Sequence, residues 1–149
     1  MKRGIRFEIP NQHGRFIAEI LEPIDYKEYK WYIDRSEIWT SCNVGAPLFT
    51  GQYIGGHEFF DLVNNDNYYI IFGVIKAFPQ SALITKITKF EEFMESECEI
   101  ILLVADSSFV DIYCKDKLLI DKLYNNAKSR SYNNLEYIDE NDSRTGMYV

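Results

Sequence analysis

The stretch ILLVADSSFVDIYCKD, residues 101–116, joins two apolar runs through the short polar segment Asp106-Ser107-Ser108. Both runs are typical of strands, and the first extends back to residue 99. Asp and Ser favour turns because their side chains hydrogen-bond the local backbone. A parallel connection needs a crossover of about a dozen residues or more, so this spacing can only join antiparallel strands. The stretch therefore predicts an antiparallel hairpin.

The acids of the same stretch raise the alternative of a metal site. Asp106, Asp111 and Asp116 offer the carboxylate ligands that Mg²⁺ prefers. Strand alternation, however, places Asp111 on the face opposite Val110 and Ile112. Asp106 belongs to the turn, and Asp116 is suited to capping the helix that follows. We therefore expect a turn, an outward strand face and a helix cap, with no metal and no organic cofactor.

Short strands and helices alternate along the rest of the chain. Period-2 patterns and continuous apolar runs predict strands, whereas apolar residues at helical spacing predict helices. The expected strands are 4–9, 29–34, 36–41, 68–78, 82–87, 99–105, 109–114 and 134–140. The expected helices are 13–22, 57–63, 88–96 and 117–130.

Pairs of strands separate most of these helices, which is typical of an α+β protein rather than of regular parallel βαβ units. We expect a single mixed, mostly antiparallel sheet with helices packed on it. At 149 residues the chain fits one domain, spanning 1–149. The polar residues 141–149 are expected to form a flexible tail.

The composition narrows the classes of function. The formal net charge is −7, whereas a general nucleic-acid binder needs a basic face. No apolar run approaches the roughly 20 residues that span a membrane, and no apolar secretion segment follows the basic N-terminal residues. Cys42, Cys98 and Cys114 form no CxxC pair, which favours buried thiols in a reducing cytoplasm over a zinc site. We expect a cytoplasmic protein that binds neither nucleic acid nor membrane, and the oligomeric state stays open.

The glycine-rich loop 45–56 and the helix after it offer one candidate site. The loop lacks the GxGxxG and P-loop patterns, so a flexible connection is favoured over a nucleotide cradle. His57 and Asp61 lie four residues apart and can share a helix face, with Glu58 beside them. Imidazole is the usual general base near neutral pH, but acids at a helix start are also explained by its positive end. The pattern leaves open a small enzyme or ligand-binding pocket built on these residues.

The distribution of charge is the most informative feature of the sequence. There is no Lys or Arg between Arg35 and Lys76, nor between Lys89 and Lys115. A surface of one sign raises encounter rates with an oppositely charged partner, although a plainly solvated helix face is the simpler alternative. In the second interval the helix 88–96 can present three acids outward together, namely Glu91, Glu92 and Glu95.

The start of the same helix fits a capping box. We expect Thr88 to accept from the backbone N–H of Glu91, and the Glu91 side chain to accept from the backbone N–H of Thr88.

Aromatic residues add to the expectation of a binding surface. Tyr29 and Trp39 lie on nearby strand positions, and Tyr and Trp are common interface anchors. The leading hypothesis is therefore a non-enzymatic binding protein of the immunity or inhibitor kind. Its expected interface is Glu91, Glu92, Glu95, Tyr29 and Trp39, and its partner is a basic protein.

Four segments resemble those of a known family. They are the opening MKRGIRFEIPN, the central YYIIFGVIKAFP, the stretch ILLVADSSFVDIYCKD and the segment NLEYIDEND. Together they are similar to short proteins of unknown function from Gram-positive, spore-forming bacteria. The resemblance covers nearly the whole chain and implies one complete domain. It implies no activity, cofactor or catalytic residue.

Overall fold

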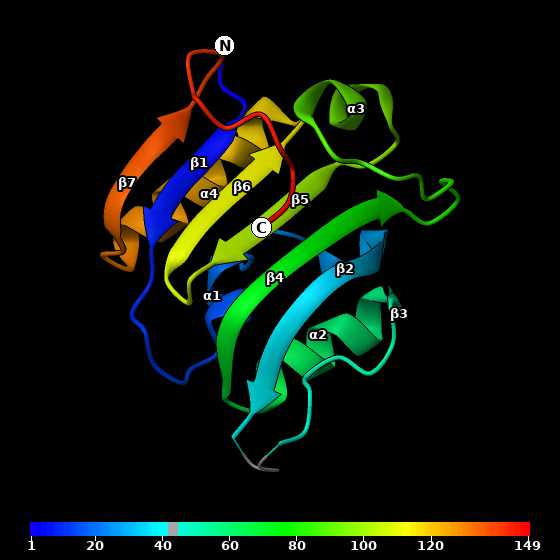
Figure 1. The fold of residues 1–149 in the computed structure, drawn as a ribbon, viewed down its shortest axis with the longest axis vertical. Helices are drawn as coiled ribbons and strands as arrows, with labels where there is room; N and C mark the ends of the chain where they lie inside the picture. The colour runs from blue at the N-terminus through cyan, green and yellow to red at the C-terminus, as the bar shows by residue number, and fades with distance from the viewer. Residues whose placement is uncertain (42–44) are drawn as a thin grey trace.

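The computed structural model describes residues 1–41 and 45–149, and these form one antiparallel sheet with helices packed on it (Figure 1). The α+β class is confirmed. Within the described residues the strands are β1 (Gly4–Glu8), β2 (Tyr29–Thr40), β3 (Tyr53–Gly55), β4 (Tyr68–Pro79), β5 (Ile100–Ala105), β6 (Phe109–Cys114) and β7 (Asn133–Ile138). The helices are α1 (Phe16–Ile20), α2 (Gly56–Asn65), α3 (Phe90–Glu95) and α4 (Lys117–Ser129), with the 3₁₀ helix η1 (Tyr26–Glu28). In the described part of the chain, no helix is both long and apolar enough to cross a bilayer.

The hairpin predicted from residues 101–116 is present as β5 and β6. The two strands pair antiparallel from Ile100 opposite Cys114 to Ala105 opposite Phe109. Asp106 and Ser107 form the turn with φ angles of 49° and 68°, in the left-handed region that tight turns require. The hairpin occupies the centre of the sheet, whose strand order is β3-β2-β4-β5-β6-β1-β7.

The two faces of the sheet are covered by different parts of the chain. Helices α1, α2 and α4 lie behind the sheet, and the C-terminal segment 139–149 crosses in front of it (Figure 1). The larger core lies on the helical face, where Trp31, Phe59 and Leu102 are fully buried. The smaller core lies on the second face, where Phe93 of α3 and Met147 of the C-terminal segment cover Leu103. Both faces of the central strands are thus covered, which explains why their apolar runs do not alternate.

Two of the expected strands differ from the structure. Residues 36–41 do not form a separate partner strand, because β2 continues to Thr40 and pairs with β4 along its length. The register of β2 against β4 shifts between Ile33 and Arg35 and again between Glu37 and Ile38. These shifts accommodate the interruption of the alternating apolar pattern. Residues 82–87 form no strand, since this segment crosses the second face and buries Ala82 and Ile87 there.

The C-terminal residues 141–149, expected to form a flexible tail, make packing contacts with the second face of the sheet. Met147 is fully buried, and its backbone N–H donates to the carbonyl of Thr88 at 3.0 Å. Gly146 forms an isolated bridge with Lys89 just before α3. Burial of the Met147 side chain on an apolar face favours docking of this otherwise polar segment.

Candidate functional site

Helix α2 carries the residues of the predicted pocket on its outer side. Gly56, Phe59 and Val63 recur at helical spacing and are buried against the core. Because these residues face inward, His57, Glu58 and Asp61 all lie on the exposed side of the helix. Gly56 fits closely beneath η1, where a Cβ atom would lie 2.3 Å from the carbonyl oxygen of Tyr26.

Glu58 and Asp61 line a groove of about 600 Å³ between α2 and residues 46–50, which we call the α2 groove. His57 and the loop glycines do not line it. The structure therefore brings together two of the three predicted residues and leaves the imidazole outside. The lining residues are Thr40, Ala46, Pro47, Leu48, Thr50, Glu58, Asp61, Leu62, Asn65 and Asp66.

The α2 groove combines negative charge with an apolar floor. Its charged side chains are Glu58, Asp61 and Asp66, and its lining contains no Lys, Arg or His. Among the described residues these three carboxylates form no ion pair. Leu48 is buried beneath them and Leu62 is half-buried. All the lining residues belong to the interval between Arg35 and Lys76 that contains no basic residue.

The two aromatic residues of the predicted interface lie far from each other. Tyr29 begins β2 and packs half-buried against the core, where burial raises the pKa of its phenol to about 12. Trp39 lies near the other end of β2 and forms a bridge with Pro47 at the α2 groove. Ten residues of extended strand span about 33 Å, so these two side chains do not form one patch.

The acids of α3 are arranged differently from the predicted capping box. Helix α3 begins at Phe90 with Lys89 at the N-cap, so the third helical residue is Glu92 rather than Glu91. The backbone N–H and the hydroxyl of Thr88 both donate to Glu92 Oε1, at 2.9 and 2.7 Å. These bonds lower the pKa of Glu92. Glu91 and Glu95 are exposed, whereas Glu92 is held in the cap.

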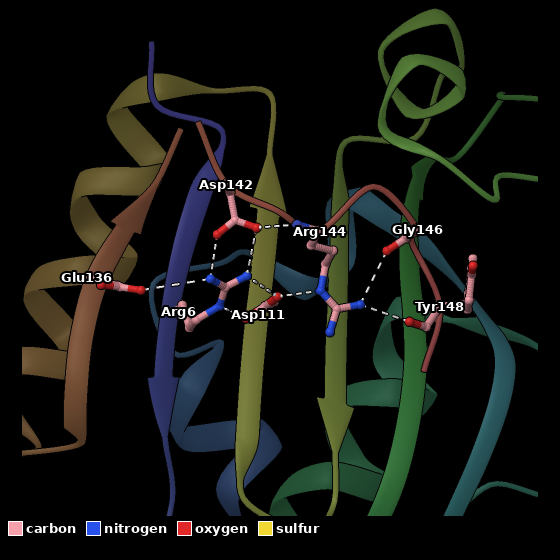
Figure 2. Close-up of polar contacts among 7 residues, drawn as sticks. All are labelled: Arg6, Asp111, Glu136, Asp142, Arg144, Gly146 and Tyr148. Carbon is pink, nitrogen blue, oxygen red and sulfur yellow. Dashed lines mark hydrogen bonds and ion pairs between the residues drawn. The ribbon is translucent and has the colours of Figure 1, made fainter. Parts of the chain in front are cut away.

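A cluster of two arginines and two aspartates lies on the second face of the sheet, and we call it the Arg–Asp cluster: Arg6, Asp111, Asp142 and Arg144 (Figure 2). It begins with the register of β1 and β6, which places Arg6 directly opposite Asp111. Arg6 Nε and Nη2 donate to the two oxygens of Asp111 at 2.7 and 2.9 Å. The same guanidinium also binds both oxygens of Asp142. Paired contacts of this kind are the strong, directional form of the arginine–carboxylate interaction.

Arg144 extends the Arg–Asp cluster along the C-terminal segment. Its Nε lies 2.7 Å from Asp111 Oδ2, and its Nη1 donates to the carbonyl oxygens of Gly146 and Tyr148 at 3.2 and 2.9 Å (Figure 2). Its backbone N–H donates to Asp142 Oδ1 at 2.8 Å. The cluster therefore fastens the C-terminal segment to β1 and β6. Because guanidinium groups engage the oxygens of both aspartates, these carboxylates are committed to structure rather than to acid–base chemistry.

The acids weighed as a metal site are separated. Asp111 lies on the face opposite Val110 and Ile112, as the alternation predicts, but the C-terminal segment buries it to 5% exposure. Asp106 lies in the turn at one end of β6. Asp116 lies beyond the other end and caps α4 by accepting from the N–H groups of Leu118 and Leu119.

The Arg–Asp cluster predicts a pH dependence of stability. Hydrogen bonds from Arg6, and the backbone N–H and charge of Arg144, lower the pKa of Asp142 from its ordinary value of 3.8. A carboxylate with a lowered folded-state pKa stabilises the fold above its unfolded-state pKa, and this contribution is lost as pH falls through the folded-state value. We therefore expect the Asp142→Asn variant to lose less stability than the wild type between about pH 5 and pH 2.

Urea unfolding midpoints across this pH range measure the effect. The Asp66→Asn variant is the matched control, because its carboxylate forms no ion pair among the described residues. Parallel profiles for the wild type and Asp142→Asn would contradict the assignment.

A second groove, of about 660 Å³, adjoins the Arg–Asp cluster. Phe109 and Tyr148 stand half-exposed or more at this groove, with exposed fractions of 52% and 59%. Its charges are mixed, because Arg6 and Arg144 lie beside acids that include Glu136, 3.8 Å from Arg6. This groove therefore favours neither sign of ligand.

The chain matches known proteins over almost its whole length. The family model described as "Protein of unknown function (DUF2691)" matches residues 2–148, a range that includes both grooves and the Arg–Asp cluster. The chain belongs to this family. A relative is the uncharacterized protein YncE of Bacillus subtilis (strain 168), which is 36% identical over 153 residues, with 100% of each chain covered. No solved structure matches the chain. The resemblance expected from the sequence is confirmed, and it is consistent with a Gram-positive origin.

For this DUF2691 chain, sequence reasoning missed Arg6, Asp142 and Arg144. Arg6 has a visible signal, since it stands at a polar position of the alternating strand β1. Its partner is set by a strand pairing across 105 residues, which no local pattern reveals.

Cys98 and Cys114 are buried as expected, and burial raises the pKa of each thiol to about 12. Cys42 lies outside the described residues.

Proposed function

We propose that the protein is a non-enzymatic protein-binding domain of the immunity or inhibitor kind, and that the α2 groove holds a basic segment of its partner. The observation that carries the proposal is the groove itself. Three carboxylates and no basic side chain line it above an apolar floor.

Electrostatics and apolar burial both favour a basic protein segment as the occupant. Unpaired carboxylates of one sign attract a cationic partner and raise the rate of encounter. The half-buried Leu62 offers apolar surface to an anchoring side chain of the partner, and such anchors supply most of the affinity in protein interfaces. Glu91 and Glu95 on α3 form a second exposed acidic surface, which we assign to long-range attraction only.

The rival hypothesis is an enzyme or ligand-binding site built on His57, Glu58 and Asp61. It requires the imidazole and both carboxylates in one concave site. His57 is exposed and outside the α2 groove, so the geometry lends the enzyme hypothesis no support.

The described thiols, Cys98 and Cys114, are free, which suits the cytoplasm as the compartment of binding.

The α2 groove predicts a strong, salt-dependent loss of binding when its charges are removed. We expect the triple variant Glu58→Gln, Asp61→Asn, Asp66→Asn to bind a lysine- and leucine-rich amphipathic peptide at least about 10-fold more weakly at about 0.05 M salt. The difference should shrink at about 0.5 M salt, where the Debye length falls to ~4 Å. Stopped-flow fluorescence with a labelled peptide measures the association and dissociation rates.

The double variant Glu91→Gln, Glu95→Gln is the matched control, because it removes exposed acids of α3 outside the groove. It should slow association slightly and leave dissociation unchanged. Equal losses in the two variants would reject the groove as the binding site and leave only a general effect of acidity. A toxin-like gene beside the gene for this protein would further support the immunity assignment.

A further inference from the structure

A row of side chains crosses the second face of the sheet at its β3 edge. Strand pairing places Tyr32 of β2 opposite both Tyr53 of β3 and Lys76 of β4. The rings of Tyr32 and Tyr53 lie 5.2 Å apart. The segment 84–88 and Tyr148 complete the walls of a pocket of about 390 Å³ over this row.

Lys76 is the unusual member of this pocket. Its side chain is 1% exposed, and a buried ammonium needs compensating partners. Lys76 Nζ donates to Asp34 Oδ2 at 3.1 Å and to the carbonyl oxygen of Ile87 at 3.2 Å. It also lies 5.9 Å from the centre of the Tyr32 ring. An ammonium has three N–H donors, and among the described residues only these two acceptors receive a hydrogen bond from this one.

The local charge of the pocket differs in sign from that of the whole chain. Lys76 and Lys86 line it with Asp34 as the opposing carboxylate, although the chain carries a net charge of −7. The Asp34 side chain is 36% exposed, so water weakens its hold on the buried ammonium. The walls are aromatic, with Tyr32, Tyr53 and Tyr148, and the volume lies within the range of small-molecule sites.

We infer that this pocket binds a small aromatic carboxylate. The carboxylate accepts the third N–H of Lys76 and faces Lys86, while the ring of the ligand packs against Tyr32 and Tyr53. This site lies on the second face of the sheet, apart from the α2 groove, and goes beyond the proposed protein-binding function. Arg144 supports this pocket indirectly. Its Nη1 donates to the backbone carbonyl of Tyr148, and Tyr148 forms one wall of the pocket.

Titration of the ¹⁵N-labelled chain with benzoate tests the site by NMR. We expect saturable shifts at the amides of residues 32–34, 53, 76 and 84–88, with a Kd of about 1 mM or tighter. Benzamide has the same ring without the charge and should bind at least about 10-fold more weakly. Cyclohexanecarboxylate keeps the charge without the aromatic ring and should also bind more weakly than benzoate.

Variants of exposed residues keep the test independent of folding. Tyr53 is 68% exposed, so Tyr53→Leu should fold normally and weaken benzoate binding about 10-fold. Lys86→Gln, also at an exposed position, should weaken it about 3-fold. The control Lys122→Gln removes an exposed lysine of α4 on the opposite side of the sheet and should leave the Kd unchanged.

Three results of the titrations with the wild-type chain would overturn the inference. They are the absence of saturable shifts up to about 20 mM benzoate, equal affinities for benzoate and benzamide, and shifts located away from the pocket. Loss of benzoate binding in Lys122→Gln would equally reject it, because that outcome points to non-specific attraction by surface charge.

Discussion

Replacing Asp111 with Asn is expected to lower the free energy of unfolding by about 3–5 kcal/mol, because it removes the shared carboxylate between two guanidinium groups. The Asp111 side chain is 6% exposed and lies 2.7 Å from both Arg6 and Arg144. An Asn amide has the same shape, but its NH₂ group would face a guanidinium donor. Arg6 would keep Asp142, whereas Arg144 would lose its carboxylate partner. Urea unfolding at about pH 7 measures the loss.

Asp121→Asn is the matched control for this prediction. Asp121 pairs with Lys2 at 2.9 Å, but both side chains are nearly half-exposed, and exposed pairs contribute at most about 1 kcal/mol. A double-mutant cycle with Arg144→Gln should show that the two losses are not additive. Similar losses in Asp111→Asn and Asp121→Asn would disprove the special role of the Arg–Asp cluster.

Replacing Trp31 with Ala is expected to lower the free energy of unfolding by about 3–5 kcal/mol, because it opens a cavity between the sheet and α2. Trp31 is 0% exposed and stacks on Phe59 of α2, with ring centroids 4.0 Å apart and planes inclined by 4°. Its Nε1 donates to the carbonyl oxygen of Tyr26 at 3.2 Å. Since Phe59 anchors the helix that carries Glu58 and Asp61, the variant should also weaken peptide binding in the α2 groove.

The Trp39→Ala variant is the control for Trp31→Ala. It also removes a large ring from β2, and it shows how much of the loss comes from that removal alone. Trp39 belongs to the same strand and is half-buried, so its removal should cost about 1–2 kcal/mol. Urea unfolding of the two variants side by side provides the comparison. Equal losses would contradict the prediction that Trp31, fully buried against Phe59, contributes more to stability than the half-buried Trp39.

Several elements could be predicted because their causes are local. The Asp106-Ser107-Ser108 turn, the cap at Asp116 and the inward residues of α2 each follow from side chains within a few residues of one another. The predicted partner of Thr88 in the α3 cap was wrong by one residue, because the helix begins at Phe90 and Glu92 rather than Glu91 accepts from Thr88. Most of the segment 36–41 continues β2 because it pairs with β4, and a local sequence pattern does not reveal that pairing.

The class of fold, the central hairpin, the acidity of the chain and the interval without basic residues that lines the α2 groove all follow from local patterns in the sequence. The burial of particular polar side chains depends instead on contacts between distant parts of the chain. Asp111 and Lys76 occupy strand positions that alternation can assign to a face, but alternation does not tell whether water or protein covers that face. The C-terminal segment covers Asp111, and residues 84–88 cover Lys76. Burial of a charge depends on such long-range packing, because it is tolerated only where distant residues supply the opposite charge and the hydrogen bonds.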